Sequence, residues 1–200
     1  MLERPQWDGR TAVCIASGPS LIPADCEIVR AAGHPVVVTN TTFQLCPWAD
    51  ALYAHDAKWW KRYRDQVEAD FRGRRFSVSQ VAANYGAETI FGEAWFKPFH
   101  NSGACAVSLA ISGGAAKVVM LGYDASLGQN GEAHFHGDHP KGLNNAGSIG
   151  TWPRQFAMLA KYARTKDVEV VNASRRTALT CFRRSELECE LLNLFEAAWG

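Results

Sequence analysis

Short runs of β-branched and other apolar residues alternate along this chain with longer segments of helical periodicity. A short apolar run predicts a strand buried on both faces, whereas apolar positions three and four apart predict a helix that buries one side. Strands are expected at residues 11–16, 35–39, 51–54, 75–79, 117–121 and 168–171. Helices are expected at residues 21–32, 57–71, 102–112, 153–164 and 185–199, the last with Ser185 as its N-cap. This alternation predicts three layers with a mostly parallel sheet.

The length and composition fit one domain. The chain has 200 residues, of which 47% are hydrophobic and 20% charged, an ordinary globular composition. No repeat, linker or low-complexity tract interrupts the elements, so residues 1–200 are expected to form a single Rossmann-like α/β domain of the nucleotide-binding type. Residues 125–150 are rich in glycine and asparagine, and we expect them to form a long functional loop.

The charge balance excludes some classes of partner. The chain has 21 basic and 20 acidic residues, and a net charge of +1 provides no broad field for a nucleic-acid backbone or an anionic membrane. Its six cysteines include no CxxC pair, and the N-terminal residues lack the apolar run of a secretory signal. We therefore expect a reduced cytoplasmic protein without a membrane partner, in which any phosphate recognition is local.

Small polar or ionisable residues follow nearly every predicted strand. In open parallel sheets, ligands bind beyond the carboxyl ends of the strands, where helix N-termini offer free N–H groups. The candidate cofactor-binding residues follow predicted strands or, at 101–103, precede the alanine-rich helix: Ser17, Gly18, Pro19, Ser20, Asn40, Asn101, Ser102, Gly103, Arg175 and Arg176. As alternatives, the first four could form only a tight turn, the asparagines only caps, and the arginines only a solvated pair. The turn lacks the GxGxxG pattern of dinucleotide folds, so NAD is not expected.

A six-residue segment starting at His134 holds three of the six histidines of the chain and a carboxylate. In an extended segment His134 and His136 point to the same face, and a turn through Gly137 would bring in Asp138 or His139. Imidazole and carboxylate groups bind divalent metals or transfer protons near neutral pH. The segment predicts a ligand or metal site, with a solvated loop as the alternative.

Two aspartates also follow predicted strands, Asp56 after residues 51–54 and Asp124 after residues 117–121. Such aspartates commonly form turns, but paired carboxylates beside a phosphate site also hold Mg²⁺. The candidate metal ligands are Asp56, Asp124, His134, His136, Asp138 and His139. The candidate catalytic residues are His136 and Asp124 as general base, together with His134 and His139.

Several segments carry a resemblance to known families. Ile15-Ala-Ser-Gly-Pro-Ser-Leu21 resembles the N-terminal nucleotide-binding motif of the family 42 bacterial sialyltransferases and of the related superfamily that includes archaeal hydroxymethylpterin diphosphokinases. Asn101-Ser-Gly103, the alanine-rich helix after it and Lys117-Val-Val-Met-Leu-Gly-Tyr-Asp124 resemble the second half of that pattern. The whole chain is similar to a phage family often labelled norphogenetic protein, through Pro47-Trp-Ala-Asp50, His136-Gly-Asp-His-Pro140, Gly142-Leu-Asn-Asn145 and Arg176-Thr-Ala-Leu-Thr-Cys181.

The sialyltransferase resemblance implies a CMP-like nucleotide across the turn at Ser17, with Asn40 and Ser102 near its ribose or phosphate. The diphosphokinase resemblance implies ATP as the donor and a divalent metal on the two aspartates. The chain departs from the sialyltransferases in two ways. It has serine at position 17 where they have asparagine, and residues 148–152 include no counterpart of their general-base histidine.

Together these features predict a nucleotide-dependent transferase that takes a nucleotide or nucleotide-sugar donor and acts on an unknown acceptor, in the cytoplasm of the host cell if the chain is phage-encoded. The alternatives are a Mg-dependent diphosphokinase-like enzyme and a non-catalytic phage protein that binds a small molecule or a partner. A zinc hydrolase is disfavoured. The segment from His134 to His139 matches the HxHxDH motif of those enzymes, but no further histidine follows it.

Overall fold

The structure, a computed structural model, describes residues 2–143 and 145–192. The strands are β1 (Thr11–Ile15), β2 (Val36–Thr39), β3 (Ala51–Tyr53), β4 (Arg74–Ser77), β5 (Glu88–Thr89), β6 (Lys117–Leu121), β7 (Glu169–Asn172) and β8 (Arg183–Arg184). The α-helices are α1 (Pro23–Ala32), α2 (Ala57–Asp70), α3 (Ser102–Ser112), α4 (Trp152–Thr165) and α5 (Leu187–Leu191). Three short 3-10 helices are η1 (Asn40–Gln44), η2 (Gln80–Tyr85) and η3 (Ile149–Thr151).

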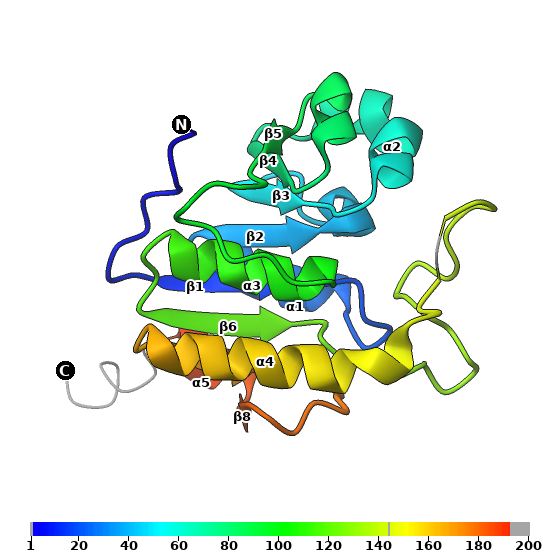
Figure 1. Cartoon of the computed structure of the whole chain (residues 1–200). Coiled ribbons are helices and arrows are strands. Elements are labelled where there is room, and N and C mark those ends of the chain that lie inside the picture. Colours follow the sequence, from blue (N-terminus) through cyan, green and yellow to red (C-terminus); the bar gives the residue numbers. More distant parts are fainter. Residues whose placement is uncertain (1, 144, 193–200) are drawn as a thin grey trace.

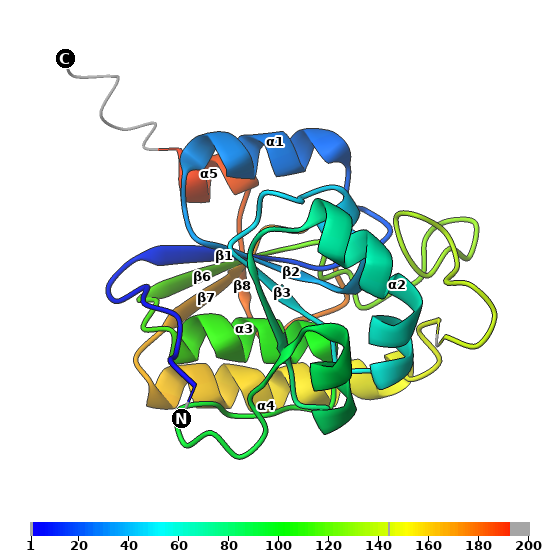
Figure 2. The same ribbon diagram turned by 90° about the horizontal axis from the view of Figure 1, so that it is seen from above.

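The strands form one sheet in the order β5-β4-β3-β2-β1-β6-β7-β8, and every neighbouring pair is parallel (Figure 1). Helices α1 and α5 lie on one face of the sheet, and α3 and α4 lie on the other (Figure 2). The structure therefore confirms the predicted three-layer, Rossmann-like α/β fold.

Burial on both faces explains why the central strands are continuous apolar runs. Residues 12–15 of β1 and 118–121 of β6 are almost completely inaccessible to solvent. Helix α3 is buried along residues 104–111, because it lies between the sheet and α4. Its alanine-rich sequence lets it approach the strands closely. All six cysteines are free, and four of them lie buried in this interior.

The predicted elements all occur, and their ends agree within two residues except at the last helix. Helix α5 spans only Leu187–Leu191, its N-cap is Glu186 instead of Ser185, and the predicted residues 193–199 lie outside the described part of the chain. The prediction missed β5 and β8 because each has two residues, too few to show a periodic pattern.

The topology creates a crevice at the carboxyl ends of the central strands. Strand β1 lies between β2 and β6. Strands β2 to β5 extend the sheet on one side of β1, and β6 to β8 extend it on the other. At such a switch point the connections diverge and leave room for a ligand beyond the carboxyl ends of the strands. The described residues 125–143 and 145–148 lie beyond these strand ends, toward which the arrowheads of β2 and β6 point (Figure 1). Within the described residues, none of the helices is both long enough and apolar enough for a membrane span.

Candidate functional site

A cavity of about 540 Å³ lies beyond the carboxyl ends of β1, β2, β3 and β6. This volume is in the range of small-molecule sites. The lining comes from the segments after these strands, the start of α3, the long loop and the start of α4: Ala16, Ser17, Gly18, Pro19, Thr39, Asn40, His55, Asp56, His100, Asn101, Ser102, Gly103, Gly122, Tyr123, Asp124, Ala125, Ser126, Ala133, His134, His139, Ala146, Gly147, Ser148, Trp152 and Phe156. Segments far apart in the sequence thus meet at one crevice.

The turn after β1 is held against the turn after β6 by Asp124. The backbone N–H and the hydroxyl of Ser20 each donate a hydrogen bond to the Asp124 carboxylate, both at 2.9 Å. A Cβ on Gly18 would lie 2.1 Å from Asp124 Oδ1 and 2.4 Å from the carbonyl oxygen of Gly122. Only glycine allows the two turns to approach this closely. Burial raises the pKa of Asp124, and the bonds from Ser20 act to lower it.

These bonds change the interpretation of Asp124. The sequence suggests it as a base or a metal ligand, but both carboxylate oxygens accept hydrogen bonds from Ser20, and the residue is 1% exposed. The observed contacts give it a positioning role: it fixes the turn that carries Ser17 and Gly18. Asp56, its expected partner for Mg²⁺, is exposed at the start of α2, makes no side-chain capping bond and lines the crevice.

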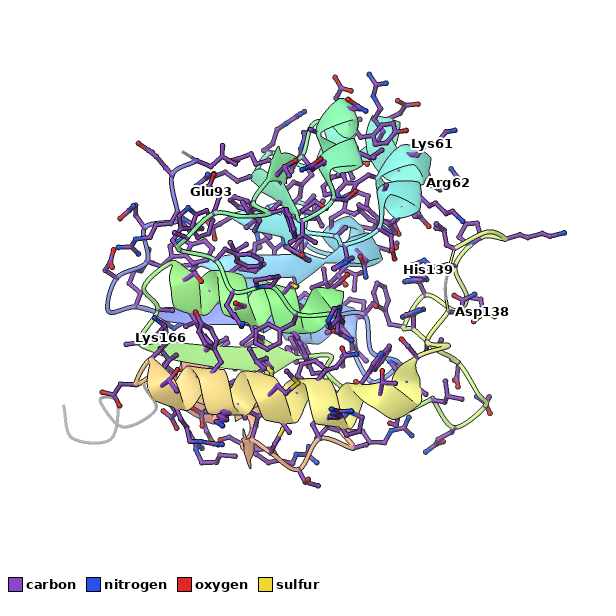
Figure 3. All side chains as sticks on the ribbon, viewed as in Figure 1. Lys61, Arg62, Glu93, Asp138, His139 and Lys166 are labelled. Atoms are coloured by element: carbon purple, nitrogen blue, oxygen red, sulfur yellow. The ribbon has the colours of Figure 1, made fainter. Side chains whose placement is uncertain are left out.

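The long loop is anchored to the same turn. The backbone N–H of Phe135 donates to the carbonyl oxygen of Ser17 at 3.1 Å, and the Ser17 hydroxyl lies 2.9 Å from Nδ1 of His134. Further along, the side chain of Asn145 accepts a hydrogen bond from the backbone N–H of His139 at 2.6 Å. Figure 3 labels His139 and its neighbour Asp138 on this loop, beyond the ends of the strands.

His134, His136 and His139 form a compact group, the histidine cluster. Their ring centroids are 4.6–5.1 Å apart, and one potential ligand nitrogen from each lies within 4.8 Å of the others. The Nε2 atoms of His134 and His136 are buried without a hydrogen-bond partner. Asp138 is exposed and does not belong to this group, so the geometry gives no support to its expected role as a ligand. The turn at Gly137 brings in His139, and Asp138 remains in solvent.

The histidine cluster is neutral at pH 7. Burial, together with the neighbouring His139 and His136, lowers the pKa of His134 to about 4. Burial and His136 likewise lower the pKa of His139 to about 4, and burial also lowers the pKa of His136. Neutral imidazoles have a free lone pair, which is the form that binds a metal or accepts a proton.

The first turn of α3 forms the opposite wall of the crevice. Asn101 is the N-cap, and its Oδ1 accepts a hydrogen bond from the N–H of Ala104 at 3.1 Å. The hydroxyl of Ser102 accepts a bond from the N–H of His55 at 3.2 Å, which ties this helix start to the end of β3. A Cβ on Gly103 would lie 2.9 Å from the ring of Tyr123, so glycine is needed for close packing here. Asn101 therefore caps the helix and also lines the crevice.

The two arginines do not line the crevice. Arg175 donates two hydrogen bonds to the carboxylate of Asp25 in α1, at 2.9 and 2.7 Å. The Asp25 side chain is only 4% exposed, and a buried carboxylate needs a cation. Arg176 donates to the carbonyl oxygen of Leu127 and lies close enough to lower the pKa of Asp124. The guanidinium of Arg175 is thus paired with Asp25 outside the crevice, and a phosphate clamp by Arg175 stays a prediction.

The sequence interpretation missed several crevice residues. His55 lies two residues beyond the end of β3 and has a buried, unpartnered Nδ1, and burial lowers its pKa. His100 precedes the cap of α3, and Trp152 comes from the start of α4. The position of His55 after a predicted strand is a usable signal in the sequence, as it is for the neighbouring Asp56. Nothing in the sequence pattern indicates that Trp152 reaches the crevice.

No family model matches the chain, and no curated protein matches it. Among solved structures it is similar to UDP-glucose 4-epimerase from Brucella ovis in complex with NAD, with 14% identity, a TM-score of 0.32, and coverage of 82% of this chain and 51% of the epimerase. The chain thus spans about half the length of that enzyme.

Two further similarities are to short-chain dehydrogenases. A variant from Serratia marcescens has 11% identity and a TM-score of 0.26, covering 83% of this chain and 73% of the other. One from Oenococcus oeni has 10% identity and a TM-score of 0.25, covering 90% and 86%. These distant similarities carry no inference about the site, and the strand order by itself defines the fold.

Proposed function

We propose that the crevice binds a nucleotide or nucleotide-sugar and transfers a group from it to an acceptor hydroxyl. One observation carries this proposal: the turn after β1, the N-terminus of α3 and a loop with neutral histidines line the same cavity. The resemblance of residues 15–21 to the sialyltransferase motif supports it, because that turn lies in the crevice wall.

The donor phosphate would lie near the first turn of α3. N–H groups at a helix N-terminus, together with the positive end of the helix dipole, favour an anion. Ser102 and Asn40, which the resemblance places near ribose or phosphate, both line the cavity. The base and sugar of the donor would occupy the remaining volume toward the long loop.

The proposed reaction is a displacement at the anomeric carbon of the donor sugar. The acceptor oxygen forms a bond to that carbon, the bond from the carbon to the phosphate oxygen breaks, and the electron pair leaves with the nucleotide phosphate. The hydroxyl proton passes to a base. A neutral imidazole suits this role at pH 7. His136, expected from the sequence, and His55, added by the structure, are the candidate bases, since Asp124 is bonded to Ser20.

A second candidate is a Mg-dependent diphosphotransferase. The observation in its favour is the free carboxylate of Asp56 at the crevice. Oxygen ligands are those that Mg²⁺ prefers. In this case, the acceptor oxygen would form a bond to the β-phosphorus of ATP, and the bond from that phosphorus to the oxygen shared with the α-phosphorus would break. AMP would leave with the electron pair, and the hydroxyl proton would pass to a base.

Thermal-shift measurements with CMP, CDP, UDP, ATP and CMP-sialic acid, each with and without Mg²⁺, test both candidates. Stabilisation by a cytidine nucleotide or CMP-sialic acid without Mg²⁺ supports the glycosyl transfer. Stabilisation by ATP only with Mg²⁺, lost in Asp56→Asn and kept in the matched control Asp65→Asn on the exposed side of α2, supports diphosphotransfer. A flat panel contradicts both and favours the non-catalytic alternative.

A further inference from the structure

We propose that His134, His136 and His139 bind one divalent transition-metal ion of the zinc class, with one coordination position open to the crevice. The metal site depends only on the geometry of the histidine cluster. The role of the ion in group transfer rests on the proposed function.

The spacing of the three side chains fits a single ion after a small adjustment. Their potential ligand nitrogens lie within 4.8 Å of one another. Around a tetrahedral zinc ion with Zn–N bonds of about 2.0–2.1 Å, the nitrogens are about 3.3–3.4 Å apart. The cluster would have to close by about 1.5 Å, which rotation of the imidazole rings about their side-chain bonds can supply.

Two ring nitrogens have no other partner. Nε2 of His134 and Nε2 of His136 are buried and make no hydrogen bond. The whole side chain of His134 is only 8% exposed, so solvent does not readily satisfy its nitrogen. Leaving a buried polar atom unpaired costs about 1–3 kcal/mol, so such atoms in a folded protein point to a missing ligand. A metal ion accepts the lone pairs of both atoms at once.

The opposite ring nitrogens are held by hydroxyl groups. Nδ1 of His134 lies 2.9 Å from the hydroxyl of Ser17, and Nδ1 of His139 lies 3.5 Å from that of Thr41. Metal-binding histidines usually make such a bond through the nitrogen away from the ion, which fixes the ring orientation and the tautomer. Ser17 and Thr41 follow β1 and β2, so the sheet itself positions two of the three ligands.

The ligand types select the ion. Three imidazoles favour zinc and its neighbours over Mg²⁺, which prefers oxygen. The described residues contribute no carboxylate to the cluster, because Asp138 is exposed and Asp124 is bonded to Ser20. Structural zinc sites have four protein ligands, whereas catalytic ones have three and leave a position for water or substrate. Three ligands beside a cavity therefore fit the second kind.

The place of the cluster suggests what the open position receives. His134 and His139 both line the crevice, so a donor phosphate bound there would lie next to the ion. A zinc ion would supply the positive charge that Arg175, paired with Asp25, does not. With His136 engaged as a ligand, His55 is left as the base.

Metal analysis of the untagged full-length chain tests the site. The protein is stripped with EDTA, dialysed against Zn²⁺, Co²⁺ or Mg²⁺, and its metal content measured. We expect about one zinc ion per chain, a tetrahedral Co²⁺ absorption spectrum and no retained Mg²⁺. His136→Ala and His139→Gln should each weaken zinc binding by at least about 100-fold, and Ser17→Ala by about 10-fold.

His34→Ala, a histidine outside the cluster, is the matched control and should retain zinc fully. Circular dichroism identifies any variant that fails to fold, and two different ligand variants keep the test decisive. Less than about one-tenth of an equivalent of zinc in the wild type, or full binding by folded His136→Ala, would overturn the proposal. Zinc binding with a flat nucleotide panel would leave the metal site standing and contradict the transfer. Nucleotide stabilisation without zinc binding would contradict the metal site and leave the proposed transfer standing.

Discussion

The histidine cluster and the ion pairs around Glu190 both bring ionisable groups together, but only the ion pairs place opposite charges next to one another. Glu190 is bonded to Lys117 and to Arg183, the latter at 2.8 Å, and Arg183 also reaches Glu169 at 2.7 Å. These four residues, Lys117, Glu169, Arg183 and Glu190, are called the charge cluster. Each of them is paired with a group of opposite charge. The three histidines have only one another and two hydroxyl groups, and two of their nitrogens have no partner.

The shifts in pKa show the same difference. Burial acts to raise the pKa of Glu190, but bonds from Arg183, Lys117 and Ser185 outweigh it and lower the pKa to about 2. At the histidine cluster, burial and like neighbours act together and lower the pKa of His134 and His139 to about 4. The charge cluster is complete within the protein and joins β6, β7, β8 and α5. The histidine cluster has two unpartnered nitrogens, and these are the basis of the proposed metal site.

The largest expected effect is that of Gly18→Ala. The added Cβ would meet Asp124 and the backbone of Gly122, so the turn that carries Ser17 must move. We expect a loss of about 3 kcal/mol or more in unfolding free energy, and loss of both nucleotide and zinc binding. Chemical denaturation and ligand titration measure these effects. Gly150→Ala, whose Cβ meets nothing within 4 Å, should change stability by less than about 1 kcal/mol. Equal effects of the two variants would contradict the close approach seen at Gly18.

The second effect is a loss of stability on acidification of the metal-free protein. Between pH 6.5 and about 4 the unfolded chain binds more protons at His134 and His139 than the folded chain, so stability falls as the pH falls through this window. A pKa shift from 6.5 to about 4 at one ring corresponds to about 3 kcal/mol. Because the three rings do not titrate independently, the separate shifts do not add, and the total loss should be on the order of 3 kcal/mol.

Denaturation curves at a series of pH values measure this slope. His136→Ala should make it shallower, because His136 lowers the pKa of both neighbours. The charge cluster acts in a different window: Glu190 has a lowered pKa, so its contribution is present above pH 4.5 and is lost toward about pH 2. An unchanged slope in His136→Ala would contradict the account of the histidine cluster.

The third effect is that of Glu190→Gln, which removes the shared anion of the charge cluster. We expect a loss of about 1.5–3 kcal/mol, because hydrogen bonds to charged partners are replaced by weaker ones. Zinc and nucleotide binding should be unchanged, as this group lies outside the crevice. Denaturation and ligand titration of the same sample provide both readouts. Weakened ligand binding would show that the two clusters are not independent.

The smallest effect is that of Arg175→Ala, which tests whether this residue only pairs with Asp25 or also binds phosphate. The Arg175 side chain is 55% exposed and its partner Asp25 is buried, so we expect a loss of about 1 kcal/mol. Nucleotide affinity should stay the same. A fall in nucleotide affinity of about tenfold or more at unchanged stability would restore Arg175 as a phosphate ligand.

The sequence predicted the fold well because the central elements are strongly patterned. Strand β6 and helix α3 were predicted to the residue, since each is a buried apolar segment with clear ends. Strand β8, with two exposed arginines, has no apolar pattern and owes its place to pairing with β7.

The site was predicted only in part. The rule that ligands bind beyond the carboxyl ends of parallel strands placed Ser17, Asn40 and Ser102 at the crevice. It could not show that Arg175 turns to Asp25, because that pairing joins residues 150 positions apart. It also could not separate His139 from Asp138, since the path of the loop through Gly137 decides which side chain is buried.

The most direct test of the account is whether zinc and nucleotide binding are coupled. Thermal denaturation of the EDTA-treated chain would be measured with zinc, with CMP or CMP-sialic acid, and with both. If the histidine cluster and the crevice form one site, the combined stabilisation should exceed the sum of the separate ones, with a coupling of about 1–3 kcal/mol. Strictly additive stabilisation would contradict the claim that they form one site.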